Sequence, residues 1–95
     1  MSVTKIATPD HISAYTAALA VEAWEHQSGK LRAVICCAEY DEGFELVLYR
    51  LHAGGRHGIW HGVGPHEIPT RTAGFATPKD ARVGARDALN NTSQR

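Results

Sequence analysis

The chain has 95 residues and a mass of 10.3 kDa, which is the size of one domain. Ten basic and ten acidic side chains cancel to a formal net charge of zero, and 43% of the residues are hydrophobic. This composition excludes a highly charged disordered chain and a histone-like basic protein, and no apolar run is long enough to span a bilayer. Because 14 of the hydrophobic residues are alanine, we expect a core with few large side chains.

The N-terminal third predicts a long helix. Thr8, Pro9 and Asp10 favour a helix start, and apolar residues then recur at helical spacing up to Gly29, a residue that commonly ends helices. Val21 and Trp24 lie outside the main apolar stripe and give this helix a second apolar side. A small domain seldom leaves such a side exposed, so the two residues predict self-association or a protein partner.

The middle of the chain predicts an antiparallel meander. The expected strands are residues 30–39, 44–51 and 58–63. Turn residues at 41–43 join the first two strands into a hairpin, and a glycine-rich turn at 53–56 leads to the third. Residues 66–74 show no period and predict a loop with a possible strand.

A second helix follows at Thr77 and Pro78, which are a favoured cap and a favoured first residue. Its expected buried stripe is Ala81, Gly84, Ala85, Ala88 and Leu89. The predicted fold is therefore α+β, in the order αβββα, with a three-stranded antiparallel meander and two helices packed on one face. We expect a single domain over residues 1–95, with frayed tails at about 1–7 and 91–95.

Basic residues gather on one side of the second helix. Lys79, Arg82 and Arg86 recur at helical spacing, and the acidic residues Asp80 and Asp87 fall on the opposite side. A cationic stripe of this kind is suited to nucleic-acid phosphates and makes binding salt-dependent. An ordinary solvated helix face is the alternative interpretation.

Aromatic residues on the predicted sheet add to this hypothesis. Tyr49, Trp60 and Arg32 are expected on the sheet face away from the helices, where they form a stacking platform for bases. A protein partner would use the same platform, and a second buried layer or one face of a dimer is the alternative interpretation of these residues.

The αβββα order is similar to that of double-stranded-RNA-binding domains. Residues 79–89 resemble the second helix of that family in the recurrence of basic residues and alanines. By that resemblance, Lys79 and Arg82 would occupy phosphate-contacting positions. The similarity is one of topology, and we assign no family from it.

Histidines raise a metal-binding alternative. His52, His57, His61 and His66 lie close together in the sequence, with an H-x3-H spacing at 57 and 61. Residues four apart in a strand are separated by about 13 Å, too far to share one ion. We therefore predict no metal site here, and exposed or strand-face histidines instead.

The two cysteines, Cys36 and Cys37, are adjacent and cannot easily bridge, which favours a reducing, cytoplasmic location. They lie in mid-strand, where a buried thiol is more typical than a nucleophile, and no Gly-Lys-Ser/Thr phosphate loop occurs. We expect no enzymatic activity and no cofactor.

These observations favour a small non-enzymatic binding module that binds nucleic acid through Lys79, Arg82 and Arg86, with stacking by Tyr49 and Trp60. The first alternative is a protein-interaction module, such as a homodimer, inhibitor or immunity-type partner, that uses Val21 and Trp24. The second is a metal-binding protein that uses the histidines. No membrane contact is expected.

Overall fold

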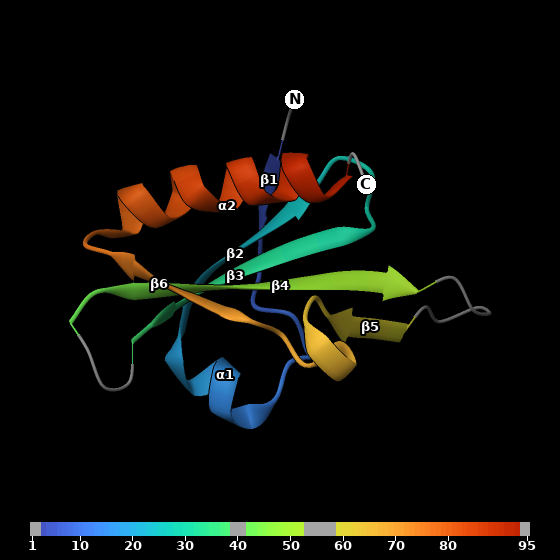
Figure 1. Cartoon of the computed structure of the whole chain (residues 1–95), viewed down its shortest axis with the longest axis horizontal. Helices are drawn as coiled ribbons and strands as arrows, with labels where there is room; N and C mark the ends of the chain where they lie inside the picture. The colour runs from blue at the N-terminus through green and yellow to red at the C-terminus, as the bar shows by residue number, and fades with distance from the viewer. Residues whose placement is uncertain (1–2, 39–41, 53–58, 94–95) are drawn as a thin grey trace.

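A computed structural model describes residues 3–38, 42–52 and 59–93. Its strands form one antiparallel sheet with a helix on each side (Figure 1). The elements in chain order are β1 (Val3–Ile6), α1 (Ala14–Leu19), β2 (Ala20–His26), β3 (Leu31–Cys37), β4 (Phe44–His52), β5 (Ile59–Gly62), the 3₁₀ helix η1 (Pro65–Glu67), β6 (Arg71–Phe75) and α2 (Pro78–Ser93).

The sheet has the strand order β1-β2-β3-β4-β5, and each neighbouring pair is antiparallel. Strand β6 also pairs with β4, next to β5 along the same edge. Residues 49–52 of β4 pair with β5, whereas residues 44–47 pair with β6. The α+β class is therefore confirmed, as are the β3–β4 hairpin and the third predicted strand, but the sheet is larger than a three-stranded meander.

The prediction of a long N-terminal helix is wrong. Helix α1 covers only Ala14–Leu19, and its N-cap is Ser13, whose Oγ accepts a hydrogen bond from the Thr16 N–H at 3.2 Å. The chain turns extended at Ala20 (φ −68°, ψ 133°) and continues as β2. Val21 and Trp24 thus belong to a strand, where β-branched and aromatic residues fit a sheet that is covered on both faces.

The two ends of the chain also differ from expectation. Residues 3–6, within the expected frayed tail, form β1 and pair with β2 in the register Val3↔His26 to Ile6↔Ala23. Helix α2 continues through Ser93. Strand β1 forms because it pairs with β2, a segment for which the sequence predicts a helix. No local sequence pattern therefore indicates a strand at residues 3–6.

The core has two layers, one on each face of the sheet. Leu31, Ala33 and Ile35 of β3 face α2, and the alternating residues Val34 and Cys36 face the side of α1. The prediction that both helices pack on one face is therefore wrong, and Figure 1 shows α2 above the sheet and α1 below it. The topology behind the similarity to double-stranded-RNA-binding domains is likewise not found.

Helix α2 begins and packs as the sequence predicts. The Asp80 N–H donates to Thr77 Oγ1 at 3.2 Å, and Ala81, Ala85 and Leu89 are fully buried against the sheet. A Cβ at Gly84 would lie 2.6 Å from Cε1 of Phe75, so glycine permits the close approach of β6. Among the described helices, none is long and apolar enough to cross a membrane.

Candidate functional site

A hollow of about 220 Å³ opens between α2 and the β1–β2 edge of the sheet. It is lined by Val3, Trp24, Lys79, Arg82, Val83 and Arg86, and we call it the cationic groove. The groove joins the three cations of the predicted nucleic-acid site to Trp24 of the predicted partner interface. The structure thus brings two sets of residues, which the sequence assigned to different functions, onto one surface.

Helical spacing explains how α2 supplies one wall of the groove. Lys79, Arg82, Val83 and Arg86 are separated by three, four and seven residues, which places them on one side of the helix. All four are exposed. Lys5 of β1 pairs in register with Trp24, and paired residues point to the same face, so Lys5 adds a positive charge from the sheet side.

A buried carboxylate, Glu22 of β2, holds Arg82 in place. Arg82 Nε lies 2.9 Å and 2.8 Å from the two Glu22 oxygens, and Nη2 lies 2.6 Å from Oε2. The Trp24 indole N–H also donates to Glu22, at 3.0 Å. The Arg82 hydrogen bonds hold the pKa of Glu22 below its ordinary value, although burial acts in the opposite direction.

This pair changes the roles of the predicted cations. Glu22 compensates the charge of Arg82, so the net positive charge of the groove comes from Lys5, Lys79 and Arg86. The sequence pattern missed Glu22 because a helix was predicted over its strand.

The two residues of the predicted partner interface occupy different environments. Trp24 is half-buried and packs against the core cluster under α2. Val21 is 47% exposed and lies between Ala20 and Glu22, where the register of the β2–β3 pairing shifts. Of the pair, only Trp24 lines the cationic groove.

The predicted stacking pair lies on the opposite face of the sheet. Tyr49 and Trp60 line a second hollow of about 410 Å³, together with His61 and His66. The Arg32 guanidinium lies 4.0 Å from the Trp60 ring centroid, as the predicted platform requires. Tyr49 is only 6% exposed, however, and burial raises its pKa. It therefore offers little surface to a stacking base.

His11 covers part of this platform. Its ring stacks on Trp60 at 5.1 Å, with an interplanar angle of 9°, and meets Tyr49 edge-on at 5.0 Å. Burial, and then the charge of Arg32, lower the pKa of His11. No sequence pattern singles out His11, because its ring contacts come from Tyr49 of β4 and Trp60 of β5.

The histidines of the metal alternative are only partly described. The His52 and His61 rings lie 4.0 Å apart across β4 and β5, and His57 lies outside the described residues. Within the described ranges, no group of three or more potential ligands is placed to hold a metal ion.

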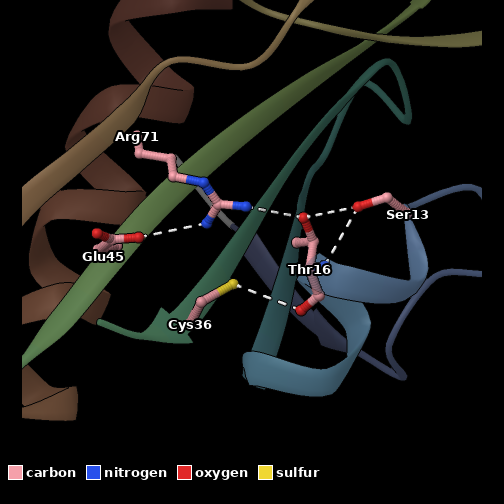
Figure 2. Close-up of polar contacts among 5 residues, drawn as sticks. All are labelled: Ser13, Thr16, Cys36, Glu45 and Arg71. Carbon is pink, nitrogen blue, oxygen red and sulfur yellow. Dashed lines mark hydrogen bonds and ion pairs between the residues drawn. The ribbon is translucent and has the colours of Figure 1, made fainter. Parts of the chain in front are cut away.

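A polar cluster beside α1 contains the buried cysteine (Figure 2). Arg71 donates to Thr16 Oγ1 at 3.0 Å and to Glu45 Oε2 at 3.3 Å, and the Cys36 thiol lies 3.9 Å from the Thr16 carbonyl oxygen. Ser13 donates to Thr16 Oγ1 at 3.1 Å. Burial raises the pKa of Cys36, which keeps a protonated thiol at neutral pH. The cluster ties α1 and β6 to the sheet and offers no activated nucleophile at Cys36.

Comparison with models of protein families, with curated proteins and with solved structures found no match to this chain. The choice of a candidate site therefore depends on the geometry of this structure alone. The cationic groove contains most of the predicted site residues, namely Trp24, Lys79, Arg82 and Arg86.

Proposed function

We propose that the protein is a non-catalytic binding module whose cationic groove binds an acidic, extended segment of a partner protein. The observation that carries this proposal is that Lys79, Arg82 and Arg86 line one hollow together with the apolar side chains Val3 and Trp24. Cations around an apolar floor complement a ligand that presents both acidic and apolar side chains on one face.

The edge of the sheet supports an extended ligand. Within the described residues, β1 pairs with β2 alone, so its outer backbone groups have no strand partner. A segment that adds to β1 as a further strand would satisfy these groups. Alternate side chains of that strand would point toward the groove, where Lys79 and Arg86 would meet carboxylates.

Nucleic acid is the second candidate. Lys79 and Arg86 are exposed on one side of α2, about 10 Å apart along the helix axis, and such a pair suits successive phosphates. Tyr49 and Trp60, the predicted stacking residues, lie on the other face of the sheet. Without their contribution, phosphate contacts alone would carry the binding, and we rank this candidate below a protein segment.

A second copy of the chain fits the groove less well. A copy paired with β1 along the same edge would bring its own Lys5 and α2 cations toward those of the first. Repulsion between these like charges would oppose pairing of the two copies along β1. If the chain self-associates, we expect it to use another surface, which includes the exposed Val21.

The test compares two kinds of probe by fluorescence anisotropy. The first is a labelled peptide in which every second residue, on one face of the strand, is in turn glutamate and valine; its control has glutamine in place of glutamate. The second comprises single- and double-stranded oligonucleotides. We expect the acidic peptide to bind more tightly than either the glutamine peptide or the oligonucleotides, with moderate salt dependence.

A pair of matched variants locates the site. Lys79→Gln/Arg86→Gln removes two groove cations, and we expect about a tenfold loss of affinity for the acidic peptide. Lys30→Gln/Arg50→Gln removes the same charge elsewhere and should leave that affinity within about twofold. Equal losses of affinity in the two variants would show that the acidic peptide does not bind at the cationic groove. Tighter, steeply salt-dependent binding of an oligonucleotide would favour the nucleic-acid candidate.

A further inference from the structure

The guanidinium of Arg82 is held by only one of its edges. Its Nε lies 2.9 Å from Oε1 and 2.8 Å from Oε2 of Glu22, and its Nη2 lies 2.6 Å from Oε2. Nε and Nη2 form one side of the guanidinium, so this contact uses the Nε–H and a single hydrogen of Nη2. The other hydrogen of Nη2 and both hydrogens of Nη1 are not used by Glu22. We call the Nη1–Nη2 side the free end of Arg82.

This free end is available to a ligand. Among the residues that the structure describes, the hydrogen bonds of Arg82 all go to Glu22. The Arg82 side chain is 47% exposed and that of Glu22 is 8% exposed, so the carboxylate lies inside and the guanidinium outside. Arg82 also lines the cationic groove. Two parallel N–H donors at the end of a guanidinium match the two oxygens of a carboxylate.

The orientation of Arg82 is set before a ligand binds, because Glu22 is itself fixed. The Trp24 indole N–H donates to Glu22 Oε1 at 3.0 Å, and Trp24 packs against the core cluster under α2. The Arg82 hydrogen bonds hold the pKa of Glu22 below its ordinary value, so the carboxylate is ionised at neutral pH. A side chain that is already ordered loses less conformational entropy when it binds a ligand.

We propose that Arg82 recognises a carboxylate of the acidic ligand through its free end, and that Glu22 is the positioning residue that orients this end. Glu22 cancels the net charge of Arg82, but the directional N–H donors remain, and they distinguish a carboxylate from a neutral amide. Lys79 and Arg86 supply the net charge that attracts the ligand. This inference rests on the function proposed above, because it names the residue that selects the acidic side chain.

The first experiment separates geometry from charge by fluorescence anisotropy with the acidic peptide. Arg82→Lys keeps the positive charge, but an ammonium group bound to Glu22 has no second pair of parallel donors. We expect Arg82→Lys to lower the affinity for the acidic peptide about tenfold. Arg50→Lys makes the same substitution outside the groove and should stay within about twofold of the wild type. An Arg82→Lys affinity equal to that of this control would overturn the inference.

A double-mutant cycle tests the positioning role of Glu22. Glu22→Gln adds one net positive charge to the groove and gives Arg82 a weaker anchor. This gain in charge cancels when Arg82→Lys is compared with its parent protein in the Glu22→Gln background. We expect the cost of Arg82→Lys to fall from about tenfold to about threefold or less in that background. An undiminished cost, with the far-UV circular dichroism retained, would overturn the positioning role.

NMR of the ¹⁵N-labelled wild-type protein gives a readout that does not depend on the folding of any variant. The acidic peptide should shift the Nη resonances of Arg82 saturably, whereas the glutamine peptide should not. Binding of the acidic peptide without this shift would overturn the inference and leave the proposed function standing on Lys79 and Arg86. Failure of the wild-type protein to bind the acidic peptide at all would overturn the inference and the proposed function together.

Discussion

Replacing Leu89 with alanine tests whether α2 is docked by one large side chain. Leu89 is completely buried, and the other fully buried residues among the described side chains of α2 are Ala81 and Ala85. Core Leu→Ala substitutions cost about 3 to 5 kcal/mol, because they lose transfer free energy and leave a cavity. A domain of this size has a free energy of unfolding of about 5 to 14 kcal/mol. Leu89→Ala should therefore remove a large part of the stability.

The assay is urea unfolding followed by far-UV circular dichroism and by tryptophan fluorescence, since Trp24 packs on the same cluster. We expect a loss of about 3 kcal/mol, and a fall in melting temperature of roughly 12 to 24 °C. Val83→Ala is the control on the same helix, because Val83 is 46% exposed, and it should change stability by no more than about 0.5 kcal/mol. A loss for Leu89→Ala that is no larger than that of the control would refute the packing of α2 on this face.

Three further predictions concern single residues. Since the pKa of His11 is lowered from 6.5 in the folded protein, the contribution of His11 to stability should be constant above that pH and decline as the pH falls below it. His11→Phe should flatten this decline in urea midpoints measured across neutral and mildly acidic pH. Cys37 is exposed and Cys36 is buried with a raised pKa, so a thiol reagent should label Cys37 rapidly and Cys36 only after denaturant is added. Gly43→Ala should cost more than about 1 kcal/mol in urea unfolding, because φ is 105° and the new Cβ would lie 2.5 Å from the Phe75 carbonyl oxygen.

The parts of the fold that the sequence predicts correctly are those with local signals. The cap at Thr77 and the alanine stripe define α2 within one stretch of chain. Strands β3 and β4 are joined by a short hairpin, and their alternating apolar residues are sufficient to predict them. Strand β3 is also apolar at nearly every position, which is typical of a strand covered on both faces. That signal indicates that the two helices lie on opposite faces.

The N-terminal part could not be predicted in this way. Ile12, Tyr15 and Leu19 have helical spacing, and nothing local shows that the helix ends at Ala20. The segment that follows becomes a strand because it pairs with β1 on one side and with β3 on the other. These pairings are tertiary contacts, which routinely override weak local propensity.

The same error concealed half of the candidate site. Helical spacing on α2 is enough to place Lys79, Arg82 and Arg86 together, but the carboxylate that binds Arg82 lies 60 residues earlier, on the strand mistaken for a helix. Trp24 reaches the groove from that strand for the same reason. Where two distant segments form a site, the residues of each segment can be selected from the sequence, while their juxtaposition depends on the sheet.

A net charge of zero is compatible with a cationic groove because charge acts over short distances. Exposed charges are screened within about 8 to 10 Å at ordinary ionic strength, so a ligand responds to its immediate surroundings rather than to the total. Asp80 and Asp87 lie about a quarter turn around α2 from Lys79 and Arg86 and do not line the groove, and Glu22 is committed to Arg82. Lys5, Lys79 and Arg86 therefore act on the groove without an equal number of carboxylates beside them, although the whole chain is neutral.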